Sequence, residues 1–232
     1  MPTSMSPDAA VPLHGLHGLY ALTPDDNLLP RLSALVESAL KGGVKWVQYR
    51  NKIAPAPLRR AQAAELLRIC RAHGAKLIIN DDIWLAVEIG ADGAHIGRDD
   101  IPGGGLQTAR DALGPKRILG VSCYDDLARA EVAVDAGADY IGIGSVFASA
   151  TKPQATRASL DVLGEAKQRF KVPVVAIGGI TTKNVQQVID KGADMVAVLS
   201  DLFDAMDIQK QAEKFQKLFR EARKDLRKDT GK

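Results

Sequence analysis

The sequence predicts an α/β fold in which eight strand–helix units close into a single (β/α)8 TIM barrel. One observation is a recurring pattern, "GADGAHIG" from Gly90, "GADYIGIG" from Gly137 and "GADMVAVL" from Gly192, with a weaker copy, "KGGVKWVQ", from Lys41. A second is that the runs after these glycines are nearly continuously apolar, which is typical of parallel strands covered on both faces. A third is that eight such units fill the 232 residues, close to the usual length of an eightfold barrel.

Each repeat indicates a helix that ends at a glycine in the left-handed cap position, followed by a short turn and a buried strand. The stretch "NVQQVIDKG" supports this, because Val185, Val188 and Ile189 have the i, i+3, i+4 spacing of one helical face. The predicted strands are 18–23, 44–50, 76–81, 93–97, 118–123, 140–146, 172–179 and 195–200. The predicted helices are 31–41, 57–73, 83–90, 105–113, 125–137, 159–169, 182–191 and 207–227. An open doubly wound sheet is the alternative, and the missing phosphate fingerprint after the first strand favours the barrel.

The chain is expected to form one domain, residues 16–228, because no long linker divides it. Residues 1–15 lack the basic start and continuous apolar core of a secretory signal, so we expect a disordered leader. Residues 229–232 are expected to be a frayed C-terminus.

Composition excludes several classes of function. The net charge is only +3 and 5% of residues are aromatic, so we expect no nucleic-acid partner. No apolar run reaches the length of a transmembrane helix, so we expect no membrane partner. Cys70 and Cys123 have neither disulfide nor zinc spacing, which fits a reduced, cytoplasmic location. Cys123 is expected to be a buried strand residue, and His95 either a core residue or one that supports the site from behind.

Polar residues gather where the predicted strands end, which is where barrel enzymes place their active sites. Gln48, Arg50 and Lys52 stand two apart, so on an extended chain they point to one side. Along the other strands, the polar or glycine-rich ends are Asn80–Asp82, Asp100, Ser122, Gly178–Gly179 and Leu199–Ser200. Asp82 and Asp99 are expected to cap the helices that follow them.

The charges at this end predict a metal and a polyanion in one site. Arg50, Lys52 and Lys152 are cations, whereas Asp81 and Asp100 supply hard oxygen ligands. Mg²⁺ typically takes one or two carboxylates together with phosphate oxygens. We therefore expect Mg²⁺ as the cofactor and a diphosphate as the anion.

A second anion site is expected in the loops after strands six to eight. Ser149, Thr151, Gly178, Gly179 and Ser200 offer hydroxyls and unhindered backbone N–H groups there. Barrels commonly bind phosphate in this position.

From Gly18 to Phe203 the chain resembles the thiamine phosphate synthase family. The resemblance rests on "VQYRNK", "LIINDD", "ADGAHIGRDD", "LGVSCYD", "GADYIGIGSVFASATKP", "AIGGIT" and "VLSDLF", which occur in family order. The family is a (β/α)8 barrel of transferases. Its members join 4-amino-2-methyl-5-(diphosphooxymethyl)pyrimidine to a thiazole phosphate carboxylate, giving thiamine phosphate, pyrophosphate and CO₂.

The resemblance also implies roles for individual residues. Arg50, Lys52, Ser122 and Lys152 would be catalytic, and Asp81 and Asp100 would bind Mg²⁺. The implied substrate-binding residues are Gln48, Tyr49, Arg50, Asn51, Lys52, Asn80, Ser122, Ser149, Ala150, Thr151, Lys152, Gly179, Leu199 and Ser200. Asn51 replaces a frequent glutamate, and its side chain is expected to point away from the Gln48 face. A homo-oligomer is possible by analogy with the superfamily.

Two alternatives remain open from the sequence. The first is a thiazole tautomerase of the same superfamily, which is expected to use a histidine after the fifth strand, where this chain has Tyr124. The second is a non-catalytic phosphate-ligand sensor, which would have no need of both a carboxylate pair and a diphosphate cluster.

Overall fold

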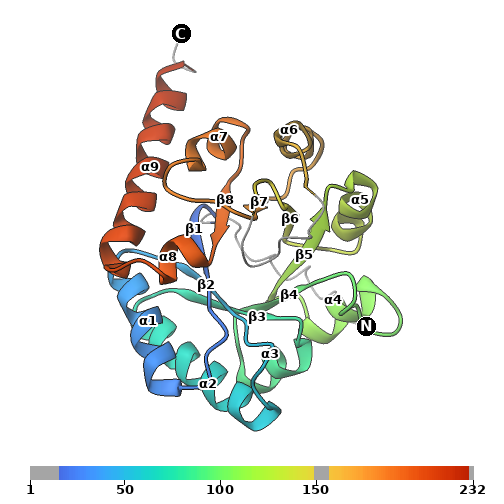
Figure 1. Cartoon of the computed structure of the whole chain (residues 1–232). Helices are drawn as coiled ribbons and strands as arrows, with labels where there is room; N and C mark the ends of the chain where they lie inside the picture. The colour runs from blue at the N-terminus through green and yellow to red at the C-terminus, as the bar shows by residue number, and fades with distance from the viewer. Residues whose placement is uncertain (1–15, 149–156, 230–232) are drawn as a thin grey trace, which may run out of the picture.

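A computed structural model describes residues 16–148 and 157–229 of the chain. Eight parallel strands pair in sequence order, and the last pairs with the first, so the sheet is a closed barrel. Figure 1 shows the strands in the middle of the molecule and the helices around the outside. The predicted (β/α)8 fold is confirmed. The predicted leader, residues 1–15, and residues 230–232 lie outside the described residues.

The elements follow the predicted order. The strands are β1 (Gly18–Leu22), β2 (Trp46–Tyr49), β3 (Lys76–Asn80), β4 (Gly93–Ile96), β5 (Ile118–Tyr124), β6 (Tyr140–Gly144), β7 (Val174–Ile177) and β8 (Met195–Val198). The helices are α1 (Leu29–Lys41), α2 (Ala56–Ala72), α3 (Ile83–Ile89), α4 (Leu106–Leu113), α5 (Leu127–Asp135), α6 (Leu160–Arg169), α7 (Val185–Asp190), α8 (Ser200–Phe203) and α9 (Ile208–Asp229).

The short helix α8 corrects the sequence prediction at the end of the barrel. Ser200 was expected inside the last strand, but β8 ends at Val198 and Ser200 begins α8. The apolar run "MVAVLSDLF" continues from strand into helix without a glycine or proline, so the pattern gave no boundary there.

Two hydrophobic layers hold the barrel together. Side chains that alternate along the strands fill its interior: Tyr20, Leu22, Trp46, Ile78, Ile118, Tyr140, Val175, Met195 and Ala197. Their neighbours on the same strands point outward and pack with the helices in a separate, larger cluster. The interior is therefore a packed core, and a ligand can enter only at an end of the barrel.

The helix ends follow the predicted chemistry with one exception. Gly90, Gly137 and Gly192 have φ of 71°, 84° and 90°, so each repeat ends its helix in the left-handed region as expected. Asp82 accepts a hydrogen bond from the Leu85 backbone and caps α3. The prediction for Asp99 was wrong, because α4 begins only at Leu106.

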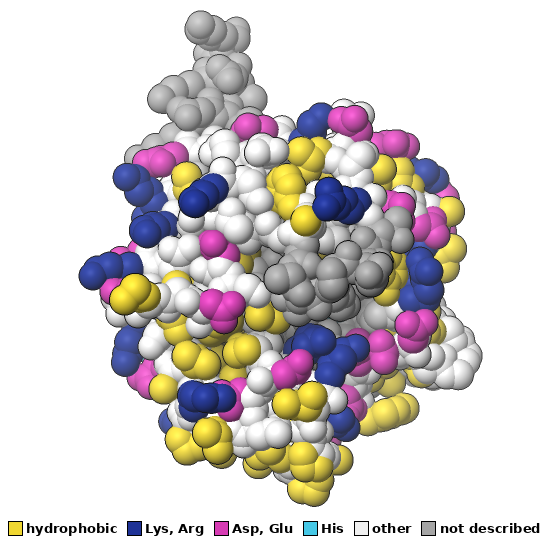
Figure 2. Space-filling model, viewed as in Figure 1, with side chains coloured by type: hydrophobic (Ala, Val, Ile, Leu, Met, Phe, Trp, Pro, Cys, Tyr) yellow, Lys and Arg dark blue, Asp and Glu magenta, His cyan; other side chains and the backbone are white. Residues whose placement is uncertain are grey.

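Helix α9 completes the outer layer by packing against α1, α7 and β1. The Gln216 side chain donates to the Gly43 carbonyl, which joins α9 to the turn before β2. Across the described residues, every helix is too short or too polar to span a bilayer. Basic and acidic side chains are interspersed over the face seen in Figure 2.

Candidate active site

The ends of β1 and β2 hold Arg50 in a defined position. Thr23 fixes its backbone, because the Thr23 hydroxyl donates to the Arg50 carbonyl and accepts from the Arg50 N–H, each at 2.8 Å. Asp25 fixes its side chain, because Arg50 Nη1 lies 3.1 Å from both Asp25 carboxylate oxygens. Only 15% of the Arg50 side chain is exposed. The guanidinium is therefore preorganised at the end of the barrel in the absence of a ligand.

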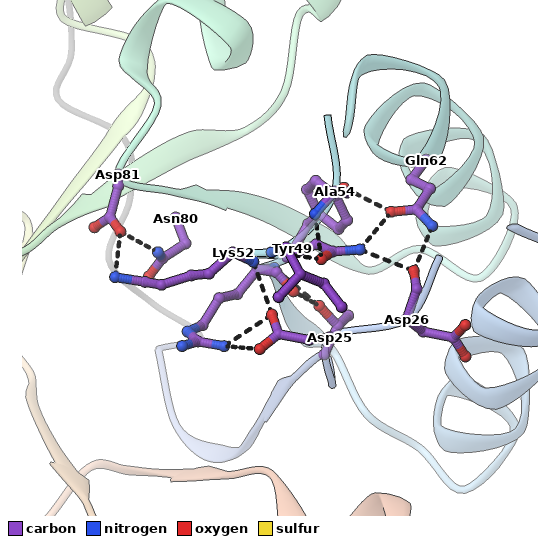
Figure 3. A network of polar contacts seen from close by, with 12 residues as sticks. Asp25, Asp26, Tyr49, Lys52, Ala54, Gln62, Asn80 and Asp81 are labelled. Carbon is purple, nitrogen blue, oxygen red and sulfur yellow. Dashed lines mark hydrogen bonds and ion pairs between the residues drawn. The ribbon is translucent and has the colours of Figure 1, made fainter. Parts of the chain in front are cut away.

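Lys52 lies beside Arg50 and is held more loosely. Its backbone N–H donates to Asp25 Oδ1 at 2.7 Å, whereas its Nζ lies 3.4 Å from Asp81 Oδ2 (Figure 3). The side chain of Lys52 is 52% exposed, so its ammonium can move to a new partner at low cost. Asn80 donates to the same Asp81 oxygen at 2.5 Å.

Two carboxylates, Asp81 and Asp100, meet next to Gly97. A Cβ on Gly97 would lie 2.9 Å from Asp100 Oδ2 and 3.6 Å from Asp81 Oδ1. The pKa of Asp100 is raised above its ordinary value, first by partial burial of the carboxyl and then by the negative charge of Asp81. Asp81 has φ of 64°, an uncommon conformation that is allowed for aspartate and typical of functional loops. Paired oxygens of this kind fit Mg²⁺, which would relieve their repulsion.

We name this group of side chains the charged rim. It consists of Asp25, Arg50, Lys52, Asp81 and Asp100, which follow strands β1 to β4 at their carboxyl ends. The predicted residues Arg50, Lys52, Asp81 and Asp100 thus lie together in the fold, and the third predicted cation, Lys152, lies outside the described residues. Whether they bind substrate and metal stays a prediction.

Tyr49 and Asn51 point to the other side of the sheet, toward α2. The Tyr49 hydroxyl donates to Gln62 Oε1 at 2.8 Å. Asn51 Nδ2 donates to Gln62 Oε1 and to the Asp26 carbonyl, and Asn51 Oδ1 accepts from the Ala54 N–H (Figure 3). Both residues are buried, with exposed fractions of 2% and 5%. Only their backbone atoms remain available for the predicted substrate contacts.

The Asn51 network also involves an aspartate that the sequence analysis did not single out. Asp26 is buried, and its carboxylate accepts from Arg31 at 2.5 Å and from the Leu28 N–H at 2.8 Å. The hydrogen bond from Arg31 lowers the pKa of Asp26 below its ordinary value. Asp26 therefore supports the loop that carries Asp25.

Gln48 and Ser122 face the barrel interior and belong to one chain of polar side chains. Gln48 Nε2 donates to the Tyr20 hydroxyl at 3.1 Å, and the Tyr20 hydroxyl lies 3.0 Å from that of Tyr140. His95 Nδ1 lies 3.0 Å from the Tyr140 hydroxyl, and His95 Nε2 lies 2.8 Å from Ser122 Oγ. We name these five residues the polar floor. His95 is buried, with 8% exposed, and contacts Ser122, so it supports the predicted site from within the core.

The loops after β7 and β8 are tied together at the far side of the barrel end. Asn184 donates to the Gly179 carbonyl at 3.0 Å and accepts from the Thr181 N–H at 2.8 Å. Asp201 of α8 accepts from the Thr182 N–H at 3.1 Å. A Cβ on Gly179 would lie 2.1 Å from the Ala148 carbonyl oxygen, so only glycine fits there.

The predicted phosphate site is described only in part. Gly179, Leu199 and Ser200 lie at these tied loops, with Leu199 preceding the first residue of α8. Ser149, Ala150, Thr151 and Lys152 lie outside the described residues, so their predicted roles stay predictions.

Several contacts of the site were missed from the sequence. Asp25 follows the first strand, where the same rule of polar residues at strand ends would have found it. Tyr20 and Tyr140 carry no such signal, because a tyrosine in an apolar strand is ordinarily read as core.

A closed parallel barrel with cations and paired carboxylates at the carboxyl ends of its strands has the layout of a (β/α)8 enzyme. Comparison with known proteins narrows the class. A family model described as thiamine monophosphate synthase matches residues 19–202. The chain belongs to this family, whose members are transferases.

Individual relatives agree with the family match. The thiamine-phosphate synthase of Thiobacillus denitrificans is 50% identical over 202 residues, covering 87% of this chain and 94% of that protein. The thiamine-phosphate synthase of Alcanivorax borkumensis is 49% identical over 202 residues, covering 85% and 90% of the two chains. The solved structure of thiamine phosphate pyrophosphorylase from Pyrococcus furiosus is 33% identical, with a TM-score of 0.81, covering 90% of this chain and 98% of that one.

Proposed function

We propose that this protein condenses 4-amino-2-methyl-5-(diphosphooxymethyl)pyrimidine with thiazole phosphate, or its carboxylate, to give thiamine phosphate and pyrophosphate. The observation that carries the proposal is the charged rim, where Arg50 and Lys52 stand beside Asp81 and Asp100. The identity of 50% with a thiamine-phosphate synthase over nearly the whole barrel supports the same reaction.

The chemistry assigned to the charged rim is stabilisation of a leaving group. The C–O bond between the pyrimidine methylene carbon and the diphosphate breaks, and its electron pair leaves with the diphosphate. Arg50 and Lys52 donate charge-assisted hydrogen bonds to this anion, each of which is worth more as negative charge develops. Asp81 and Asp100 would hold Mg²⁺, which supplies further positive charge to the same group.

Bond formation follows at the same methylene carbon. The electron-rich aminopyrimidine stabilises the methylene cation, and the lone pair of the thiazole nitrogen forms the new C–N bond. With the carboxylated thiazole, CO₂ leaves and the remaining ring carbon takes up a proton. The chain needs no side-chain nucleophile for these steps. The loops that carry Gly179, Leu199 and Ser200 would position the thiazole through its phosphate.

A pyrophosphate-release assay with both substrates tests this function. We expect release that requires both substrates and Mg²⁺, with thiamine phosphate formed in equal amount. Conversion of one thiazole tautomer to another without pyrophosphate release would favour the tautomerase. Binding of the pyrimidine diphosphate in a calorimeter, with no turnover, would favour the sensor.

The position after β5 separates the synthase from its superfamily alternative. Tyr124 ends β5 with φ of 59°, and its ring lies under the Arg98 guanidinium, 4.6 Å from the ring centroid. Tyrosine therefore stands where the tautomerase is expected to carry its histidine, and its ring is occupied by the stacked guanidinium. The charged rim and Tyr124 together support coupling rather than tautomerisation.

A further inference from the structure

The polar floor crosses the barrel from one wall to the other and takes one residue from each of five strands. Gln48 comes from β2, Tyr20 from β1, Tyr140 from β6, His95 from β4 and Ser122 from β5. Four contacts of 2.8 to 3.1 Å join them end to end. Both ends, Gln48 and Ser122, are residues expected to contact the pyrimidine substrate.

The direction of each hydrogen bond in the polar floor can be worked out from Gln48 onward. The Gln48 amide donates to Tyr20, so the Tyr20 oxygen is already an acceptor. Among the described residues, the Tyr20 hydroxyl has only one other hydrogen-bond partner, Tyr140, so its own proton must go there. The Tyr140 proton must then go to Nδ1 of His95, the next atom along.

The tautomer of His95 follows from the proton that Tyr140 donates to it. A neutral imidazole has one donor and one acceptor nitrogen, so when Nδ1 accepts, Nε2 carries the proton. Nε2–H then donates to Ser122 Oγ at 2.8 Å. The Ser122 oxygen becomes an acceptor toward the interior, and its own proton is directed to an acceptor at the end of the barrel. With the Gln48 amide oriented to donate, the opposite order would leave the buried Tyr20 hydroxyl with no acceptor among the described residues.

The packing around Tyr140 holds this arrangement rigidly. A Cβ on Gly120 would lie 2.0 Å from the Tyr140 ring, so glycine is what admits the ring to the barrel centre. The ring stacks on His95 at 5.5 Å between centroids and meets Tyr20 edge to face at 6.0 Å. Burial raises the pKa of both phenols well above the ordinary tyrosine value, so both keep their protons.

We infer that Tyr140 is a positioning residue that fixes His95 as the Nε2–H tautomer, so that Ser122 presents its hydroxyl proton to an acceptor atom of the substrate, such as a pyrimidine ring nitrogen. This inference rests on the proposed function for the identity of the substrate. The tautomer itself is a property of the ligand-free protein.

Nitrogen NMR of protein labelled with ¹⁵N-histidine tests the tautomer without any turnover. We expect His95 near neutral pH to show a protonated Nε2 and an unprotonated Nδ1, with its signals assigned by their loss in His95→Asn. In Tyr140→Phe the preference for Nε2–H should disappear. Tyr49→Phe is the matched control, because it also removes one buried phenol hydrogen bond, to Gln62, and should leave the His95 signals in place.

A wild-type His95 that is protonated on Nδ1, or on both nitrogens, overturns the inference. So do unchanged His95 signals in Tyr140→Phe. If Tyr140→Phe does not fold, Tyr20→Phe gives the same test one step further along the chain. These readings stand even if no pyrophosphate is released, so they separate this inference from the proposed function.

Kinetics of a double-mutant cycle test whether Tyr140 acts through Ser122. Tyr140→Phe should lower kcat/KM for the pyrimidine diphosphate by about three- to tenfold, the effect of one buried hydrogen bond. In the Ser122→Ala background the same change should cost less than about twofold. Equal losses in both backgrounds would show that Tyr140 acts independently of Ser122 and would overturn its positioning role.

Discussion

The charged rim and the polar floor are neighbouring parts of one barrel end, but they are built in opposite ways. The rim side chains stand in loops just beyond the strands, carry full charges, and pair through contacts such as the 3.4 Å approach of Lys52 to Asp81. The floor side chains stand within the strands and are joined by hydrogen bonds, and Tyr20 and Tyr140 are each 1% exposed. A rim pair can exchange its partner for a ligand, whereas the floor contacts join strand side chains to one another across the barrel. The rim is suited to binding and releasing a charged group of a ligand, whereas the floor is suited to holding a side chain such as Ser122 in one orientation.

Removing a rim cation should give the largest loss of activity. In Arg50→Ala we expect kcat/KM for the pyrimidine diphosphate to fall roughly 10- to 150-fold, because a charge-assisted hydrogen bond is worth about 1.5–3 kcal/mol. Arg68→Ala is the charge-matched control, since Arg68 is 68% exposed on α2 and pairs with Glu65. Equal activity of the two variants would remove Arg50 from the site.

The second largest effect should be a change in the Mg²⁺ dependence of activity when Asp81 is replaced. In Asp81→Asn we expect the Mg²⁺ concentration for half-maximal activity to rise by about tenfold, because one of two anionic ligands is lost. Binding of Mn²⁺, followed by electron paramagnetic resonance, should weaken in parallel. The control is Asp82→Asn, which alters the cap of α3 but not the carboxylate pair. A metal response that changes in the control and not in Asp81→Asn would contradict the assignment.

Asn51 should affect stability and not chemistry. Asn51→Ala leaves the buried Ala54 N–H without its acceptor, so we expect the free energy of unfolding to fall by about 1–3 kcal/mol, measured by urea denaturation. The turnover of the remaining folded enzyme should stay within twofold of wild type. A large loss of turnover with unchanged stability would instead return the Asn51 side chain to substrate binding.

The smallest expected effect concerns the two cysteines, which should not react with alkylating reagents near neutral pH. Burial raises the pKa of Cys70 and Cys123 to about 12. Both should therefore resist alkylation at pH 8 in the folded protein and react fully in urea, as counted by mass spectrometry. Because the folded pKa lies above the unfolded value of about 8.5, their stabilising contribution is complete below that pH and is lost as the pH rises toward 12. Rapid labelling of either thiol in the native protein would contradict this burial.

The fold was accessible from sequence because its signals are local and repeated. Each glycine of the "GAD" repeat ends a unit, and each apolar run marks a strand, so the eight units could be placed in order. Ser200 was misplaced for the same reason, since four residues of helix after β8 produce no periodic pattern of their own. The prediction that Asp99 caps a helix was wrong because an aspartate after a strand does not show how many loop residues precede the next helix.

Four of the five charged rim residues, all except Asp25, were also predicted, because charged residues that follow apolar strands are easy to recognise in a sequence. The connections of the polar floor were not, because they join residues 27 to 120 positions apart whose types are common in cores. Tyr20 and Tyr140 become polar components only when the closed barrel brings β1 and β6 to face each other. Asn51 shows the same limit, since alternation placed its side chain on the outer face but could not reveal Gln62 as its partner.

The pairing of Arg50 with Asp25 and of Lys52 with Asp81 has a consequence for the speed of ligand capture. In the charged rim, two cations face three carboxylates, so these five side chains by themselves exert little long-range attraction on an approaching polyanion. Their contribution to the association rate constant should consequently vary little with ionic strength, and tight binding would follow arrival, when the ammonium and guanidinium leave their aspartates.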